Sequence, residues 1–519
     1  TGGGAPTPPA GGTTATAAAA PAAGPPKAPA ALKRGGILKI ATTGEPPSLA
    51  DAMFTTATAT ANVAEQMFEG LFARDSKFAP RPMLVERHTA SPDGKSYEFT
   101  LRRGVKFHNG KDLAAADVVA SLRRWGQLSS RGKLIFGRLD GIAATDAATV
   151  TMTFKEPTGV LLDFLALSEA FILPAEVADA AGKNKLENNQ LIGTGPFMFK
   201  EHQVDRYIRL VRFDGYTPRE EAPDGVSGKK VAYLDELQLI PVPDESVRVN
   251  GLITGEYHFN ESVPPDQYDT VRNDQNLTAL TVRPNFWYCP HFNKKQGIFT
   301  DVRMRQAVVL AFSQAEAMVA GFGRQEFIRL DPGVSAPETV WYSTAGGDVY
   351  NKPDPERARA LLREAGYNGQ TVRWLCTKES IYSYNMSEYI KQKLEAVGMK
   401  VELVVSDWAT VIKNRANAEG YEVHVTGHSA YAHPALHPFN DKAWPGFWDN
   451  AEKDRLVGAM VAEADAARQK QTIDDYQALV WRDMPFVKCG ENFALRAARK
   501  EVAGYTNTPN WFFWNVALG

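Results

Sequence analysis

The sequence lacks an excess of charge of either sign. Its 519 residues carry 58 lysines and arginines against 60 aspartates and glutamates, which gives a formal net charge of -2. A nucleic-acid-binding surface needs a clustered basic excess, and this balance does not supply one. The sequence also has no run of about 18 apolar residues, the length that a membrane-spanning helix requires. We therefore expect a chain that binds no nucleic acid and does not span a membrane.

Cysteine is scarce. The three cysteines are Cys289, Cys376 and Cys489, and no two of them form a CxxC pair. This spacing argues against a disulfide scaffold and against a zinc module. We expect the three side chains to be buried as small apolar residues. One disulfide, which would leave a single thiol over, is the alternative.

The usual catalytic motifs are absent. The sequence contains no GxSxG, HExxH, P-loop or GxGxxG motif, and motifs of this kind identify many enzymes. The segment GTGPF at 193–197 has the glycines of a turn but lacks the Lys-Ser/Thr pair of a phosphate loop. We therefore expect neither catalysis nor a cofactor. A metallohydrolase built on clustered histidines remains the enzyme alternative.

Large apolar residues are nearly missing from residues 1–34, which are mostly Ala, Pro, Gly and Thr. Such a segment cannot bury a core, so we expect a disordered or semi-extended tether. A tether would let the folded part stand off from a membrane anchor, and a dispensable tail is the alternative. The chain begins at Thr1 rather than at a methionine, which suggests processing or trimming.

From Gly35 onward the sequence contains a mixture of helix and strand patterns. Apolar residues at helical spacing predict helices at 60–72, from about 114, and at 302–320, 355–366 and 384–397. Short alternating or β-branched runs predict strands at 37–41, 96–101, 150–154, 206–212, 236–241, 371–376, 399–405 and 421–426. Without internal repeats, this mixture predicts an α/β protein with more than one sheet.

The densest motif is DGKSYEFTLRRGVKFHNGKDLAAADVVASLRRW at 93–125. Its Asp-Gly dipeptide is typical of a turn, and Gly104 and Gly110 free the backbone at two bends. Together with five further segments in the right order, it resembles the family of extracytoplasmic solute-binding proteins that serve peptide and nickel importers. The five are GEPPSLADA at 44–52, FEGLF at 68–72, IGTGPF at 192–197, FTDVRMRQAVVLAF at 299–312 and DPERARALLREAGY at 354–367.

The resemblance implies a two-lobed periplasmic-binding-protein fold of type II, in the large form with an extra subdomain. The implied ranges are 35–72, 190–283 and 497–519 for lobe I, 73–189 for its extra subdomain and 284–496 for lobe II. Connections near Pro284 and Arg496 would act as a hinge, and bending there would engulf a ligand between the lobes.

The same resemblance implies a function. The chain would be the substrate-binding receptor of an ABC importer, in the periplasm or outside the cell, with the N-terminal segment as its tether. It would act as a monomer, capture a small organic ligand, peptide-like or other, and deliver it to an inner-membrane permease. A receptor for metal chelates of the nickel type is the alternative.

The resemblance also implies two binding residues in lobe II. Oligopeptide-binding members carry a tryptophan that lines a side-chain pocket and, seven residues on, an arginine that neutralises a carboxylate. The matching residues are Trp408, at the end of VELVVSDW, and Arg415. Alternatively, Trp408 begins a helix and packs inward while Arg415 is solvated.

A loop after Gly427 departs from the family pattern. Peptide-binding members carry an aspartate here, in roughly Gly-Trp-x-x-Asp, that pairs with the ligand's ammonium. This chain reads Gly-His-Ser-Ala-Tyr, and no carboxylate lies between Glu422 and Asp441. A buried ammonium needs a counter-charge, so we expect that no carboxylate of this loop holds one. Ser429 and Tyr431 would instead contact a neutral, aromatic-rich or acceptor-bearing ligand.

Four of the nine histidines lie close together, at His424, His428, His433 and His437. Such spacing is compatible with metal ligation, with hydrogen bonds to an organic ligand, or with ordinary core and loop roles. We select His428 and His433 as hydrogen-bonding candidates and assign no metal ligand.

Three further residues complete the predicted site. Tyr288 follows the expected hinge and could face the cleft. Phe54 and Thr55 lie in the loop after the first strand. A ligand enclosed between lobes needs aromatic walls and a few placed polar groups, which these residue types supply.

Overall fold

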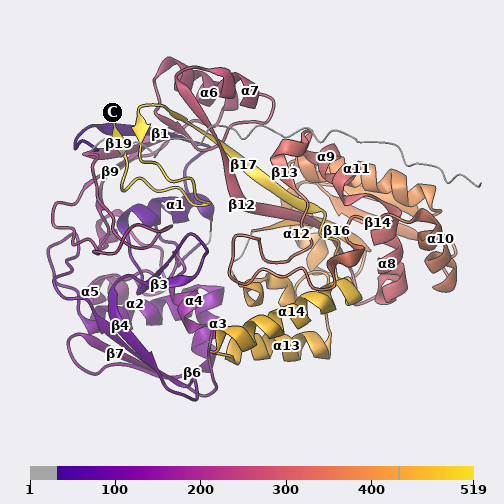
Figure 1. The fold of residues 1–519 in the computed structure, drawn as a ribbon, viewed down its shortest axis with the longest axis horizontal. Helices are drawn as coiled ribbons and strands as arrows, with labels where there is room; N and C mark the ends of the chain where they lie inside the picture. The colour runs from indigo at the N-terminus through magenta and orange to yellow at the C-terminus, as the bar shows by residue number, and fades with distance from the viewer. Residues whose placement is uncertain (1–31, 56, 430–432) are drawn as a thin grey trace, which may run out of the picture.

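The computed structural model describes residues 32–55, 57–429 and 433–519 (Figure 1). Its largest sheet has 11 strands, in the order β15-β14-β16-β12-β17-β11-β1-β10-β9-β8, with β13 paired to β17. A four-stranded sheet, β4-β5-β7-β6, and two sheets of two strands complete the β-structure of the described chain. The prediction of an α/β protein with more than one sheet is confirmed. Residues 1–31, where the tether is predicted, lie outside the described residues.

The first lobe is built on one end of the large sheet. Its strands are β1 (Ile37–Thr42), β8 (Phe197–Gln203), β9 (Tyr207–Arg212), β10 (Glu236–Pro241) and β11 (Phe259–Asn260). Helices α1 (Thr58–Met67), α6 (Glu245–Thr254) and α7 (Tyr268–Asn273) belong to it. Near the C-terminus, Trp511 and Phe513 are buried in the core that also contains Leu38 and Ile40, because large aromatic side chains gain most from leaving water.

A small sheet subdomain follows β1 and α1 in the chain (Figure 1). It comprises β4 (Val85–Ala90), β5 (Ser96–Leu101), β6 (Leu139–Ala144) and β7 (Thr149–Phe154), with α2 (Ala115–Leu128), α3 (Ser130–Arg138), α4 (Leu161–Leu165) and α5 (Ala175–Ala181). The short strands β2 (Phe72–Arg74) and β3 (Pro80–Pro82) lie beside it. Asp117, the third residue of α2, stabilises the start of the helix, since its carboxylate accepts a hydrogen bond from the Ala114 amide at 2.9 Å.

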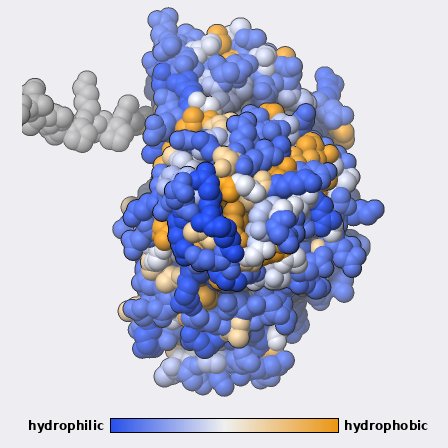
Figure 2. Space-filling model, turned by 90° about the vertical axis from the view of Figure 1, so that its right-hand side faces the viewer, coloured by the Kyte–Doolittle hydropathy of each residue, from blue (hydrophilic) through white to orange (hydrophobic). Residues whose placement is uncertain are grey.

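The second lobe is built on the other end of the large sheet. Its strands are β14 (Thr371–Cys376), β15 (Lys400–Val405) and β16 (Val423–Ser429), with the short β13 (Ile328–Arg329) alongside β17. Its helices are α8 (Val302–Ala311), α9 (Gln314–Phe322), α10 (Pro355–Glu364), α11 (Ile381–Ala396), α12 (Trp408–Ala416), α13 (Ala451–Ala462) and α14 (Ala466–Asp483). Viewed from the α8–α10 end, the surface is largely hydrophilic, with hydrophobic residues gathered near its centre (Figure 2).

The single long helix predicted at 302–320 is wrong. The chain leaves the helical conformation at Phe312, with φ -143° and ψ 160°, and a new helix begins after Ser313. The Ser313 hydroxyl accepts a hydrogen bond from the Glu316 amide at 3.2 Å and so caps α9. The apolar periodicity continues across the break, which is why the sequence pattern does not reveal it.

Two long antiparallel strands, β12 (Leu277–Phe292) and β17 (Gly490–Arg499), carry the large sheet from one lobe to the other (Figure 1). Their register runs from Leu277 opposite Arg499 to Tyr288 opposite Gly490 and shifts between Val282 and Phe286. The expected hinge positions, near 284 and 496, lie on these strands. All three cysteines are buried and free, as expected. In the described part of the chain, no helix is both long and apolar enough to cross a membrane.

Candidate ligand-binding site

A cavity of about 380 Å³ lies between the two lobes. Its wall contains residues of the first lobe, of the segment around β2, of the crossing strand β12 and of the second lobe. Among them are Glu65, Arg74, Arg283, Phe286, Ser429 and Asn510. This volume falls within the range of roughly 300–1,000 Å³ that is usual for small-molecule sites.

Two oppositely charged side chains of this wall, Glu65 of α1 and Arg74 of β2, are half-buried. Desolvation raises the pKa of Glu65, against the effect of Lys230, of a hydrogen bond from Asn510 and of Arg74. Desolvation lowers the pKa of Arg74 to about 10, although Asp163 acts in the opposite direction. Within the described residues, neither side chain forms an ion pair within 4 Å, and Nη2 of Arg74 has no hydrogen-bond partner.

Other charged residues of the wall are already paired. Lys230 Nζ lies 3.5 Å from Glu69, and an Arg131 nitrogen lies 3.1 Å from Glu169. Glu338 accepts a hydrogen bond from Arg329 at 2.6 Å. Arg283 is exposed, and its guanidinium lies 4.1 Å from the Phe493 ring, with no ion pair among the described residues. A half-buried charge without an ion-pair partner is more costly, and in the described part of the wall Glu65 and Arg74 are the half-buried acidic and basic groups of this kind.

Ser429 is the one predicted residue of the described chain that lines this cavity. It ends β16 and pairs with Phe286 of β12, which lines the cavity as well. Tyr431 lies outside the described residues. The absence of a carboxylate between Glu422 and Asp441 leaves Glu65 as the acidic group in the cavity without an ion-pair partner among the described residues.

Trp408 and Arg415 lie against each other, away from the cavity wall. Asp407 caps α12 by accepting a hydrogen bond from the Thr410 amide at 2.9 Å, so Trp408 is the first residue of the helix. The Arg415 guanidinium lies 5.2 Å from the Trp408 ring and 5.4 Å from the Trp444 ring. Its Nε and Nη1 are buried and have no hydrogen-bond partner in the part of the chain that the structure describes, so Arg415 is not freely solvated.

The histidines lie in the interior of the second lobe. His428 Nε2 is 2.8 Å from Nε2 of His291, and His433 Nδ1 accepts a hydrogen bond from the Ala435 amide at 3.1 Å. Burial lowers the pKa of His428 well below its usual range and that of His433 to about 3. Both rings are therefore neutral at physiological pH, and neither lines the cavity.

The remaining predicted residues also lie off the cavity wall. Tyr288 packs against the Phe322 ring at 5.3 Å, and burial raises the pKa of its hydroxyl. Phe54 is 50% exposed, and Thr55 donates its amide to the Asp51 carbonyl at 3.2 Å. Glu65 and Arg74 were missed by sequence reasoning. The burial of Asn62 and Gln66 on the same helix, which marks polar side chains turned inward, is visible only in the structure.

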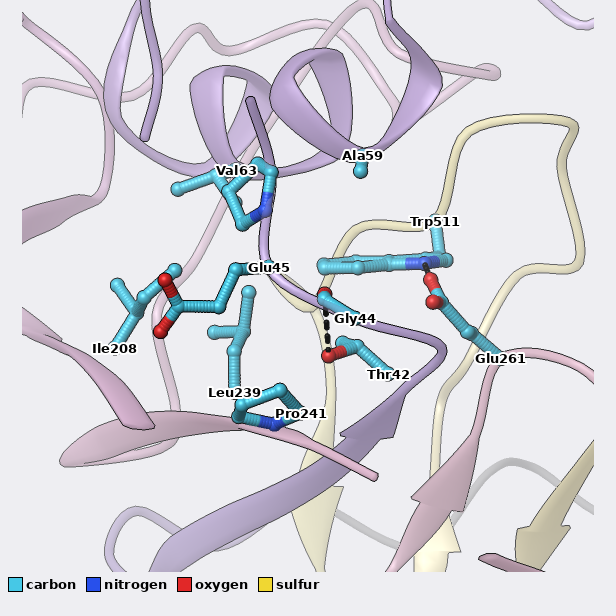
Figure 3. Close-up of a pocket in the computed structure, with 11 residues that line it drawn as sticks. Thr42, Gly44, Glu45, Ala59, Val63, Ile208, Leu239, Pro241, Glu261 and Trp511 are labelled. Carbon is cyan, nitrogen blue, oxygen red and sulfur yellow. Dashed lines mark hydrogen bonds between the residues drawn. The ribbon is translucent and has the colours of Figure 1, made fainter. Parts of the chain in front are cut away.

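A second, much smaller cavity lies inside the first lobe (Figure 3). Its volume is about 10 Å³, roughly the space of one water molecule. Glu261 accepts a hydrogen bond from the Trp511 indole at 3.0 Å, and Thr42 donates one to the Gly44 carbonyl at 3.2 Å. This space is too small for an organic ligand, so the larger cavity is the candidate site.

The two-lobed architecture with a cavity at the lobe junction is that of a ligand-binding protein. The profile described as "Bacterial extracellular solute-binding proteins, family 5 Middle" matches residues 79–447. The chain therefore belongs to family 5 of the bacterial extracellular solute-binding proteins, which are receptors of ABC importers rather than enzymes.

Individual relatives cover nearly the whole chain. A probable peptide ABC transporter periplasmic-binding protein, y4tO of Sinorhizobium fredii, is 28% identical over 90% of this chain and 91% of its own. The glutathione-binding protein GsiB of Escherichia coli is 26% identical over 87% and 88%. The structure of AgaA from A. tumefaciens R10 in complex with agropinic acid has 26% identity, a TM-score of 0.73, and coverage of 93% and 99%.

Proposed function

We propose that this receptor captures a small zwitterionic, peptide-like molecule in the cavity between its lobes. The observation that carries the proposal is the pair of half-buried, oppositely charged groups, Glu65 and Arg74, that have no ion-pair partner among the described residues. The relatives named for peptides, glutathione and agropinic acid support a ligand of this size and class.

The two charges have complementary tasks. A ligand ammonium would donate hydrogen bonds to the Glu65 carboxylate, and a ligand carboxylate would accept them from the Arg74 guanidinium, whose planar fork suits carboxylates. Asn510 would hold Glu65 in place through its existing hydrogen bond. Ser429, from the second lobe, would add a hydroxyl contact, so that the ligand joins both lobes.

The other parts of the function are proposed with this site. The receptor would deliver its ligand unchanged to a membrane permease and act as a monomer, with residues 1–34 as its tether. Bending near 284 and 496 would close lobe II (284–496) over the ligand. The ligand contacts predicted from the sequence at other positions stay predictions. They are Trp408, Arg415, His428, His433, Tyr288, Phe54, Thr55 and Tyr431.

Calorimetry with a dipeptide and its blocked forms tests the proposal. We expect the free dipeptide to bind, and the N-acetyl and C-amide forms to bind at least tenfold more weakly, because each leaves one buried charge unmet. Glu65→Gln should abolish the preference for a free N-terminus, and Arg74→Gln the preference for a free C-terminus. Glu98→Gln, which changes an exposed carboxylate of β5, is the matched control.

Native mass spectrometry of protein purified without refolding gives an independent view of the ligand. A co-purified molecule that carries both charges would support the proposal. A tightly bound ligand without an amine, or blocked and free dipeptides that bind alike, would overturn the zwitterion assignment.

A further inference from the structure

A cluster of soft donor atoms lies between β12 and β16, within the second lobe. Cys289 and His291 of β12 lie opposite Thr426 and His424 of β16, and His428 follows two residues further along β16. Alternate residues of a strand point to the same face, so these side chains converge. Cys289 is 0%, His291 1% and His428 4% exposed.

The donor atoms are close enough for one metal ion. The Cys289 sulfur and a ring nitrogen of each of His291 and His428 all lie within 4.8 Å of one another. Metal–nitrogen bonds of about 2 Å and metal–sulfur bonds of about 2.3 Å place donors of one ion roughly 3–4 Å apart. The three side chains therefore need to move by only about 1 Å to share an ion.

A second observation points to a missing ligand in the same place. His424 stacks on His291 with ring centroids 5.2 Å apart and is fully buried. Neither of its ring nitrogens has a hydrogen-bond partner among the described residues. Buried polar groups are normally satisfied, so this part of the lobe holds more donor capacity than the protein itself uses.

We propose that Cys289, His291 and His428 bind one Cu(I) ion inside the second lobe, separately from the ligand cavity. Thiolate and imidazole are soft donors, and a trigonal His₂Cys set is one that copper favours. Binding breaks the Cys289 S–H bond, releases the proton to solvent and forms the S–Cu bond, with no change in oxidation state.

The charges around the site favour a monovalent ion over zinc. The cationic groups that act on Cys289 include Lys488 and Arg415. Cu(I) with one thiolate is neutral, whereas Zn²⁺ with the same donors carries a net positive charge beside these cations. In a poorly hydrated interior that extra charge is expensive. The surroundings also include the rings of Trp444, Phe486 and Phe439, which keep water out.

The test uses the full chain refolded anaerobically, because the site is enclosed, with Cu(I) supplied as its bicinchoninate complex. We expect one Cu(I) per chain to be withdrawn from the chelator, and X-ray absorption to report one sulfur and two nitrogen neighbours. Cys289→Ser should lose the metal. Cys376→Ser, which removes the buried thiol of β14, should retain it.

Three results would overturn the proposal. They are Cu(I) binding that persists in Cys289→Ser, a sulfur-free coordination shell, or stoichiometric Zn²⁺ uptake by the same residues with no Cu(I). If Cys289→Ser fails to fold, the proposal is tested by the coordination shell of the native chain and by the copper content of His428→Gln. A native shell of one sulfur and two nitrogens and a loss of copper in His428→Gln would support it, and the opposite results would overturn it. Dipeptide binding is measured in the same samples, so a failure of the copper site is distinguishable from a failure of the ligand cavity.

Discussion

At the scale of single residues, His108 ties the small sheet subdomain to the loop that precedes β8. Its Nδ1 accepts a hydrogen bond from the Gly193 amide at 3.1 Å, and its Nε2 lies 3.1 Å from the Gly195 carbonyl oxygen and donates to it. The neutral ring forms both hydrogen bonds, whereas a ring protonated at Nδ1 can no longer accept the hydrogen bond from the Gly193 amide. Burial lowers the pKa of His108 to about 4, although the Gly195 carbonyl acts to raise it.

This low pKa makes His108 a source of acid sensitivity. An unfolded histidine has a pKa of about 6.5. Below that pH, His108 is protonated in the unfolded chain but stays neutral in the folded chain. The contribution of His108 to stability is therefore complete above pH 6.5 and falls by up to about 1.4 kcal/mol per pH unit below it, until the folded pKa is reached. Urea unfolding at pH 7.5 and pH 5.0 should show a smaller acid-induced loss in His108→Gln than in the native chain. An equal loss in both would refute this role.

At the scale of elements, the Ser313 hydroxyl caps α9 at the break between α8 and α9. The Ser313 hydroxyl accepts a hydrogen bond from the Glu316 amide and donates one to the Asn351 side chain at 3.1 Å. We expect Ser313→Ala to lower the free energy of unfolding by about 1 kcal/mol, whereas Ser313→Asp, which keeps a capping oxygen, should cost less. Denaturant midpoints of the two variants measure the difference, and equal losses would show that the cap is unimportant.

Elements bounded by clear signals could be predicted from the sequence, and sites formed by distant segments could not. The strand at 371–376 has the predicted bounds, since glycine and polar residues flank a short apolar run. The break between α8 and α9 was missed because helical periodicity carries no information about a cap. Ser429 was found because it follows a strand in a recognisable motif. Glu65 and Arg74 were not, because only folding brings α1 and β2 to the same cavity.

At the scale of the whole molecule, the small sheet subdomain touches the second lobe backbone to backbone. The Val160 amide donates to the Val461 carbonyl at 3.4 Å. A Cβ atom added at Gly159 would lie 1.9 Å from the Glu463 carbonyl oxygen. Glycine is therefore required for this approach, because any side chain would hold the two parts apart.

Gly159→Ala should consequently hinder closure. We expect its affinity for the dipeptide probe to fall at least tenfold, about 1.4 kcal/mol, with less compaction in small-angle scattering when the probe is added. Gly137→Ala, where an added Cβ meets nothing within 4 Å, should bind and compact like the native chain. Native-like compaction of Gly159→Ala would show that this contact does not form on ligand binding.

The paired crossing of β12 and β17 constrains how the two halves of the molecule can move. Two hydrogen-bonded strands side by side resist torsion about their common axis far better than two separate linkers would. The register shift between Val282 and Phe286 interrupts their ladder, and this is where the ribbon is most easily flexed. In the proposed closure the halves would therefore swing along one path. Each loaded molecule would then present the same outline to a partner that distinguishes a full receptor from an empty one.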